Sequence, residues 1–474
     1  MTQTRRTTSE ELGDAPPVRD RSNLILLVLC SAAFMALLDV FVVNVAFTAI
    51  GASYSGSDLS DLSWVLNGYT IVYAALLIPA GRLADRHGRK AGFITGVALF
   101  SLASLACAFA PSLWWLVAFR VLQAAGAAAL TPTSLGLLLT TLPAERRAGA
   151  VKIWATSTAL AGAIGPVLGG FLVTVSWEWI FLINVPLGAA AIVGTVLLVP
   201  ETKDSSITRI PDVVGAIAIA IGFGGLSLAL VKGDEWGWTS RSTLLAFAVT
   251  VVAFVVVAIR MAKHSAPIID PALLRVRSFF WSNVTAVLFC TAFGAILPSI
   301  ILRMQTSLHY DALITGLAVA PGPLLVPFVA ALGQRLSRRM SPSALVALGN
   351  AFVGLGAVLM AVTATTEVNY WTQIFPGWML VGVGVGFALP NLLAKATVDL
   401  PPARVSVGSG IVNTSRQVGY VLGVTMLVAI LGTLTASAAD SLDSFRWGWW
   451  AIAATGLLAT LTSFGIAAQA RADR

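Results

Sequence analysis

The sequence carries little charge. Only 11% of its 474 residues are Asp, Glu, Lys or Arg, and 57% are apolar. An average soluble protein carries roughly 25% charged residues and roughly 45–50% apolar residues. One globular core cannot hide so much apolar surface from water, which excludes a soluble multidomain enzyme. We therefore expect an all-α integral membrane protein.

Cysteine and histidine are also scarce, with three of each. Cys30, Cys107 and Cys290 all fall within apolar runs, which excludes a disulfide framework. The histidines are predicted to lie in separate loops: His87, His264 and His309. The chain also has no nucleotide-binding signature and no nucleophile–base constellation. We therefore expect no metal, no cofactor and no enzymatic activity.

Fourteen apolar runs lie between Leu24 and Ala467. Each is close to the about 20 residues that cross a bilayer core of ~30 Å as a helix. With the N-terminus placed in the cytoplasm, 24 of the 30 basic residues fall on that side and 2 lie within the runs. The other 4 are predicted to lie in outer loops: Lys232, Arg241, Arg303 and Arg446. Positive charge is retained on the cytoplasmic side during insertion. This bias predicts that both termini are cytoplasmic.

The chain repeats itself. Three segments recur at offsets of 258, 254 and 253 residues: 126–132 with 384–390, 165–169 with 419–423, and 82–86 with 335–339. Duplicated halves that rock around a central site are typical of secondary transporters. We predict an N-terminal six-helix half at 24–199, a linker with two extra transmembrane helices at 200–280, and a C-terminal six-helix half at 281–467. The tail at 1–23 lacks the apolar core of a signal peptide and is expected to be disordered, and 468–474 forms a cytoplasmic tail.

Several motifs resemble those of a known family. The segment GRLADRHGRK at 81–90 resembles the signature loop of the major facilitator superfamily, between the second and third spans. Motifs in five further spans resemble those of its fourteen-span drug:proton antiporters: Asp39 with Asn44, Arg120 with Gln123 and Gly126, Gly162 with Gly165, Pro166 and Gly169, Asn184 with Pro186, and Asn413 with Arg416 and Gly419. The resemblance extends from Leu24 to Ala467 and is greatest to actinobacterial antibiotic exporters. Glu178 departs from it, since the family usually has a basic residue there.

The resemblance implies the major facilitator fold and proton-coupled antiport that exports amphipathic small molecules, hydrophobic or cationic, such as drugs and antibiotics. It implies a monomer in the bacterial cytoplasmic membrane, with protons, lipids and the substrate as partners and no nucleic acid. Two alternatives remain. One is a lipid or metabolite exporter of the same fold. The other is a non-transporting sensor, which predicts an appended soluble domain, whereas the longest loop, at 260–282, has only 23 residues.

Three charged residues are predicted to lie within spans: Asp39, Arg120 and Arg416. Charge inside a bilayer is costly and marks functional pathways. At a rise of about 1.5 Å per residue, Asp39 and Arg120 lie at a similar depth and could pair. We predict that Asp39 binds the coupling proton and that Arg120 controls its pKa. The alternative is a structural bond between two helices.

Three further groups complete the predicted site. Polar residues at helical spacing in the run 407–431 are expected to face the substrate cavity or to form bonds between the halves: Ser409, Asn413, Arg416 and Tyr420. Asn44 and Gln123 are predicted to line the same cavity. Small residues with a proline are expected to allow close packing and hinging: Gly162, Gly165, Pro166 and Gly169. A conformational latch, or alternatively a purely topogenic loop, is predicted from Gly81, Asp85, Arg86, Gly88 and Arg89, with Asp85 accepting bonds from the N-terminus of a neighbouring helix.

Overall fold

The computed structural model describes residues 22–54, 56, 58–203, 212–264, 267–367, 369–401, 404–432 and 438–466. The two predicted tails lie almost entirely outside these residues, except that the first helix already begins at Ser22.

The N-terminal half contains seven helices: α1 (Ser22–Ser53), α2 (Leu59–His87), α3 (Arg89–Ala108), α4 (Leu113–Thr141), α5 (Ala144–Val175), α6 (Trp179–Leu182) and α7 (Asn184–Leu198). Two inserted helices follow: α8 (Val213–Trp236) and α9 (Arg241–Lys263). The remaining elements are α10 (Pro271–Leu274), α11 (Arg277–Ser307), α12 (Ala312–Val319), α13 (Pro321–Leu336), α14 (Pro342–Thr363), the π-helix η1 (Tyr370–Ile374), α15 (Phe375–Val398), α16 (Val405–Leu431) and α17 (Ala438–Ile466).

Fourteen helical segments among the described residues are long and apolar enough to cross a membrane, as the sequence predicts. Three of these segments combine two elements each: α6 with α7, α12 with α13, and η1 with α15. Helices suit a bilayer because they satisfy their own backbone groups, and polar side chains cap several of their first turns. These capping residues are Asp58, Asp212, Ser240, Asp311 and Ser341.

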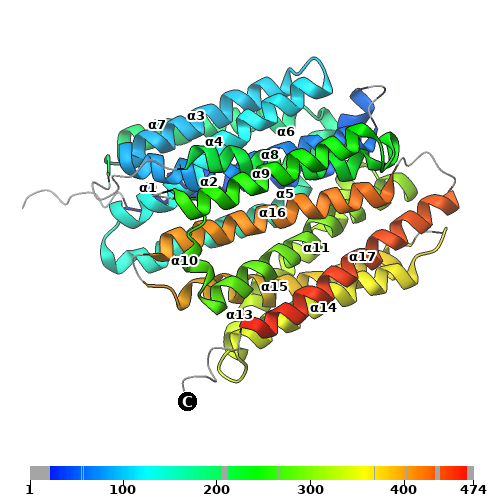
Figure 1. Ribbon diagram of the computed structural model, residues 1–474. Helices are drawn as coiled ribbons and strands as arrows, with labels where there is room; N and C mark the ends of the chain where they lie inside the picture. Colours follow the sequence, from blue (N-terminus) through cyan, green and yellow to red (C-terminus); the bar gives the residue numbers. More distant parts are fainter. Residues whose placement is uncertain are drawn as a thin grey trace, which may run out of the picture.

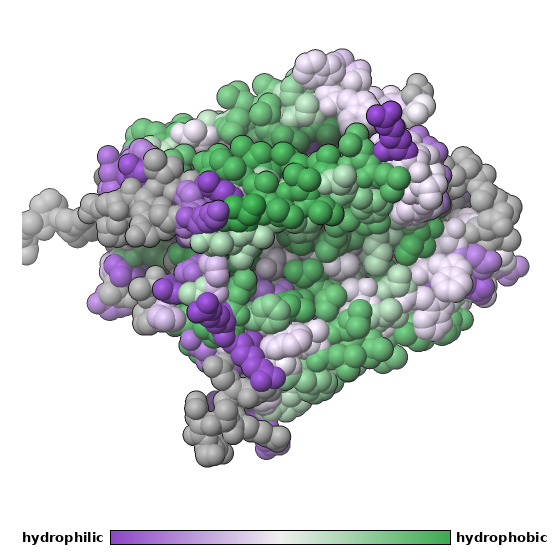
Figure 2. Space-filling view, in the orientation of Figure 1, coloured by the Kyte–Doolittle hydropathy of each residue, from purple (hydrophilic) through white to green (hydrophobic). Residues whose placement is uncertain are grey.

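The long helices run along one common direction, with the N-terminal half in the upper part of the view in Figure 1 and the C-terminal half in the lower part. We name the end of the bundle where α1 begins and α17 ends the proximal end, and the opposite end the distal end. Hydrophobic side chains cover most of the face seen in Figure 2, and hydrophilic residues gather towards the two ends. This distribution fits a bundle that crosses a membrane from end to end.

The internal duplication appears as repeated helix packing. A Cβ atom on Gly126 would lie 2.5 Å from the backbone of α3, and one on Gly384 would lie 2.6 Å from the backbone of α14. Similarly, Gly169 packs against the backbone of α1, and Gly423 packs against that of α11. The repeated glycines therefore mark equivalent helix pairs, in which only a glycine allows the backbones to come so close.

The segment 81–90 is mostly helical rather than a loop, so that prediction was wrong, and His87 is the last residue of α2. No residue from 81 to 87 breaks the helix. Gly88 has a φ of 137°, which only glycine adopts easily, and α3 starts immediately after it.

Two cations predicted to lie in outer loops are buried within helices instead. Lys232 is 8% exposed and Arg303 is 3% exposed. The Lys232 ammonium lies 2.9 Å from Asp61 and 2.7 Å from Glu235, and Arg303 donates to the backbone carbonyl of Thr365 at 2.8 Å. From hydropathy, the two apolar runs end at Val231 and Leu302, directly before these cations, whereas the helices continue to Trp236 and Ser307. Hydropathy does not count such partners, which offset the cost of burying a charge.

The inserted hairpin α8–α9 covers the line where α2 meets α16. Ile219 of α8 belongs to an apolar cluster with Ile78 of α2 and Ile411 of α16, and Ser227 bonds to Thr425 of α16 at 2.9 Å. α8 therefore contacts both halves. The limits of the three parts, at 199/200 and 280/281, stay predictions.

An ion pair closes the hairpin at its proximal end. Arg260 donates to Asp212 at 2.6 and 2.8 Å, and the N–H of Gly215 donates to the same oxygen at 2.9 Å. Burial raises the pKa of Asp212, but these hydrogen bonds and the positive charge outweigh it, and the pKa lies below its usual value.

Candidate functional site

Asp39 lies midway along α1 and accepts hydrogen bonds from two neighbouring helices. Arg120 of α4 forms an ion pair with one carboxylate oxygen. The other oxygen accepts from the amides of Gln123, at 2.8 Å, and Asn184, at 3.1 Å. Asp39 and Arg120 are each only 1% exposed, and Gln123 is fully buried. The predicted pairing of Asp39 with Arg120 is present, while its role in proton coupling stays a prediction.

The Arg120 guanidinium is held on several sides. Its Nη1 donates to Gln123 at 2.6 Å, because residues three apart share one face of α4. Its Nε donates to the carbonyl of Val65 at 3.2 Å, and its Cζ lies 4.1 Å from the ring centroid of Tyr69. A cation over an aromatic face is attracted to it. Among the described residues, Asp39 is the only carboxylate that pairs with Arg120. Protonation of Asp39 would therefore leave the positive charge of Arg120 without a negative partner.

Three residues of this cluster have no predicted role: Ser104, Asn184 and Tyr69. The Ser104 hydroxyl accepts from Gln123 at 2.5 Å and from Asn184 at 3.1 Å. Asn184 is the first residue of α7, directly after the break that separates α7 from α6. A match to the sixth-span motif marks Asn184 in the sequence, but nothing there indicates that it reaches Asp39.

The polar stripe of α16 lies on one half-buried face, as its spacing predicts. The other faces of the helix are occupied, since Thr414 donates to the carbonyl of Ala74 in α2 and Gly419 packs on α11. Within the stripe, Arg416 donates to Asn413 at 3.1 Å, and Asn413 donates to the carbonyl of Ser409. Contact of this stripe with a substrate stays a prediction.

The other two predicted cavity residues differ in position. Gln123 belongs to the Asp39 cluster and not to a cavity wall, because both ends of its amide are used within that cluster. Asn44 donates to the carbonyl of Val40 at 2.7 Å and borders a gap of about 10 Å³ between α1 and α16. That gap is too small for a substrate, so the halves are closed at this level.

The glycine stripe of α5 packs closely against another helix, which is α1, while its role as a hinge stays a prediction. A Cβ atom on Gly165 would lie 2.6 Å from the Cβ of Phe41, and one on Gly162 would lie 3.3 Å from the ring of the same residue. Gly169 would meet the backbone of Val42 at 3.0 Å. Pro166 lies within the helix, where it removes one backbone hydrogen bond.

An adjacent face of α5 closes the distal end against the other half. A Cβ atom on Gly170 would lie 2.3 Å from the carbonyl of Ala312, and one on Gly316 would lie 2.1 Å from the carbonyl of Pro166. Nearby, Thr48 of α1 donates to Gln305 of α11 at 2.9 Å. We call these contacts of α5 with α12 and of α1 with α11 the distal gate.

The predicted latch residues gather at the proximal end. Asp85 accepts from Arg89 at 2.5 Å, within its own half, and Arg86 is half-buried beside it. The N-terminus of α3 is instead capped by Glu201, which accepts from the N–H groups of residues 90 and 91 at 3.0 and 3.2 Å. The expected bond between Asp85 and the N-terminus of a neighbouring helix is therefore absent from the described contacts.

Two latch glycines are tightly packed. A Cβ atom on Gly81 would lie 3.2 Å from Pro132 of α4, and one on Gly88 would lie 2.9 Å from Glu201. Gly88 therefore needs glycine both for its backbone angle and for its contact with the capping carboxylate.

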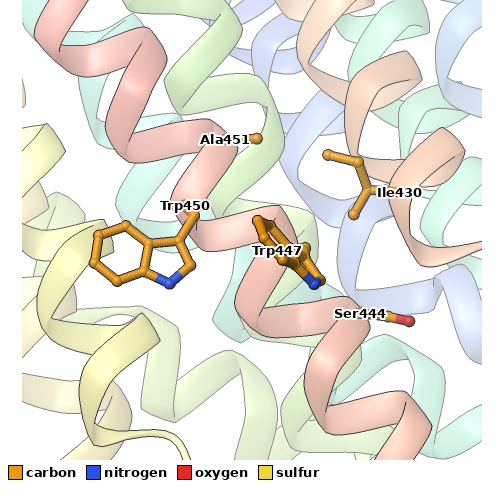
Figure 3. A pocket seen from close by; sticks show the side chains of 5 residues that line it. All are labelled: Ile430, Ser444, Trp447, Trp450 and Ala451. Carbon is orange, nitrogen blue, oxygen red and sulfur yellow. The ribbon is translucent and has the colours of Figure 1, made fainter.

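A shallow pocket of about 590 Å³ opens on the surface between α16 and α17. Figure 3 shows the five side chains that line it: Ile430, Ser444, Trp447, Trp450 and Ala451. It contains no titratable side chain, and exposed tryptophans near a helix end are typical of a membrane interface. Among the described residues there is also no group of three or more His, Cys, Asp or Glu side chains that could hold a metal ion.

Solved structures share the fold. A POT family transporter in complex with a thioalcohol-conjugated peptide superposes with a TM-score of 0.67 at 15% identity, over 93% of this chain and 94% of its own. A D-xylose–proton symporter superposes with a TM-score of 0.66 at 11% identity, over 93% of this chain and 97% of its own. At these identities the likeness concerns the fold alone.

Sequence relatives are more similar. The methylenomycin A resistance protein of Streptomyces coelicolor is 31% identical over 450 residues, covering 94% of this chain and 93% of the relative. The cephamycin export protein of Amycolatopsis lactamdurans is 32% identical and covers 88% of this chain and 87% of the relative. The family model of the Major Facilitator Superfamily matches residues 29–424. With its fourteen apolar helices and this match over most of its length, the chain belongs to the major facilitator superfamily.

Proposed function

We propose that this protein is a secondary active transporter that exports amphipathic small molecules, including drugs and antibiotics, in exchange for protons. The observation that carries this proposal is the carboxylate of Asp39, buried midway along a membrane-spanning helix and paired with Arg120. Intramembrane carboxylates of this kind serve as proton relays in transporters. The names of its relatives, which are resistance and export proteins, support export as the direction of transport.

Proton exchange at Asp39 would change how three helices are held together. The ionised carboxylate ties α1 to Arg120 of α4 and to Asn184 of α7. The protonated group has no negative charge, so the tie to Arg120 weakens and α1 is free to move relative to α4. In transporters built from two repeats, such local changes bias the rocking of one half against the other.

The direct test uses purified protein in proteoliposomes with an imposed pH gradient. We expect the wild type to accumulate the neutral amphipathic fluorophore N-phenyl-1-naphthylamine on the acidic side. Collapse of the gradient with nigericin should abolish accumulation. Accumulation that continues after collapse would contradict proton coupling.

The proposed orientation places the proximal end in the cytoplasm, because the basic residues gather there. We expect a cysteine at Asp234 to react with a membrane-impermeant thiol reagent from outside intact cells. Cysteines at Lys203 and Arg338 should react only after the cells are opened. The three native cysteines are buried, so the background should be low. If Asp234→Cys reacts only from the cytoplasmic side, the inserted hairpin does not cross the membrane, which contradicts the fourteen-span topology.

The proximal end gives a prediction for two carboxylates. Asp85→Asn should slow transport, because it loosens the junction of α2 with α3 at the proximal end, where Asp85 bonds to Arg89. It should change thermal stability little, because this partly exposed bond contributes about 0.3–0.5 kcal/mol. Glu201→Gln should lower stability by about 1 kcal/mol, because it weakens the cap of α3. Transport rates and melting curves at equal protein amounts measure both. A normal transport rate for Asp85→Asn would show that this segment does not act as a latch and only helps to set the topology of the chain.

A further inference from the structure

Arg416 lies near the middle of α16 and is only half-exposed. Its Nη1 donates to Asn413, while its Nε is buried without a hydrogen-bond partner. No carboxylate among the described residues pairs with it. An arginine stays protonated in proteins, so this helix carries a positive charge that its surroundings do not neutralise.

The other buried cations of the bundle have their charge or donors satisfied. Arg120 has the carboxylate of Asp39, and Lys232 has three carboxylates within 3.3 Å. Arg303 donates to a backbone carbonyl at 2.8 Å and to a serine hydroxyl at 3.0 Å. Arg416 differs from Arg120 and Lys232 because no described carboxylate pairs with it, and from Arg303 because one of its buried N–H groups has no acceptor. An uncompensated charge at membrane depth is expensive.

The chain itself offers no second anion at this depth. In the sequence, Asp39 is the one acidic residue within the apolar runs, and it is already bonded to Arg120, Gln123 and Asn184. A partly exposed guanidinium in this position is available to an anionic group from outside the chain.

We infer that Arg416 binds an anionic group of the transported molecule, so that the substrate is an amphipath with a carboxylate, a sulfonate or a similar anion. This inference rests on the proposed export function. An anionic substrate differs from the hydrophobic or cationic one that the family resemblance implies. The planar guanidinium offers several N–H donors in a geometry that matches such groups.

Aromatic side chains beside Arg416 suit the apolar part of such a molecule. Tyr420, one turn further along α16, interacts with Arg416, and its ring lies 6.0 Å from that of Phe293 in α11. Tyr73 of α2 is near enough to interact with Arg416 electrostatically, and it stacks with Tyr69 at 6.0 Å. The anion site is thus bordered by aromatic rings from both halves.

The test compares two fluorophores that share one ring system. 8-Anilino-1-naphthalenesulfonate carries a sulfonate, and N-phenyl-1-naphthylamine lacks it. In proteoliposomes with an imposed pH gradient, Arg416→Gln should raise the apparent KM for the sulfonate about 10- to 100-fold, the range expected for a lost charged hydrogen bond. The value for the neutral amine should change less than about twofold. Arg416→Lys keeps the positive charge but loses the planar set of N–H donors. Its apparent KM for the sulfonate should lie between those of the wild type and Arg416→Gln.

Arg338→Gln removes the same charge from an exposed site at the proximal end and should change neither value. An equal loss for both fluorophores in Arg416→Gln would assign Arg416 a structural role and overturn the inference. Should Arg416→Gln fail to fold, the ratio of the two KM values in Arg416→Lys decides in the same way. A wild type that exports the amine but not the sulfonate would also overturn it. A wild type that exports neither would contradict the proposed function as well.

Discussion

Asp39→Asn is expected to abolish proton-driven export at equal membrane abundance. The amide keeps the size of the side chain and cannot release a proton at physiological pH. It also leaves Arg120 buried without a counter-charge, and the loss of one partner of a buried pair costs about 3–5 kcal/mol. The variant should therefore lose both coupling and thermal stability. Accumulation of a fluorophore under an imposed pH gradient and melting curves of the purified protein measure the two effects.

A double variant separates coupling from stability. Asp39→Asn with Arg120→Gln removes both charges, so it should recover much of the stability but none of the proton-driven accumulation. Asp39→Glu keeps a titratable group and should keep part of the activity. If the double variant instead accumulates substrate as well as the wild type, Asp39 and Arg120 form only a structural tie. Proton coupling would then have to be sought at another group.

Gly316→Val should have the second largest effect, through the distal gate. The new Cβ would lie 2.1 Å from the carbonyl oxygen of Pro166, so α12 and α5 could not approach as they do here. Overpacking of this kind costs about 1–3 kcal/mol, which shifts the balance between open and closed gates about 10- to 100-fold. We expect export to fall by a similar factor, because a transporter that cannot close one side cannot complete its cycle.

A thiol reporter distinguishes an open gate from a misfolded protein. Thr48→Cys places the reporter on α1, where the native hydroxyl bonds to Gln305 across the two halves. A membrane-impermeant reagent added at the distal side should label it faster in the Gly316→Val background. Gly149→Val on α5 is the matched control, since a Cβ there meets nothing within 4 Å. Unchanged labelling and unchanged export in Gly316→Val would show that this contact does not control closure.

The sequence predicts the fourteen spans and the ion pair of Asp39 with Arg120, for two physical reasons. The hydropathy of a spanning helix is averaged over about 20 residues, so local errors cancel. Only three charged residues are predicted within the spans, so an acidic and a basic residue at the same depth have almost no other charged group to pair with. The glycine stripe of α5 was also predictable, because its spacing alone puts the small residues on one face.

The remaining parts of the site could not be predicted in this way. Ser104 and Asn184 are uncharged, and many similar residues, such as Thr70, bond only to their own helix. The burial of Lys232 depends partly on Asp58 and Asp61, which are distant in sequence, and the distal gate depends on which arrangement the two halves adopt. Gln123 was predicted to line the substrate cavity, but its side chain bonds to Asp39, Arg120 and Ser104 instead. Helical spacing shows on which face of α4 a residue lies, but it does not show which side chains it contacts.

The inserted hairpin makes the two sides of the bundle unequal towards lipid. α8 lies over the line between α2 and α16, bonded to α16 through Ser227 and to the start of α2 through Lys232. An amphipath dissolved in the bilayer therefore meets a wall of helix on that flank. On the opposite flank, α5 packs directly against α12 and α13, and no inserted helix of the described residues lies over that line. The hairpin thus gives the two flanks of a duplicated bundle different outer surfaces: one line between the halves is covered by an additional helix, and the other is not.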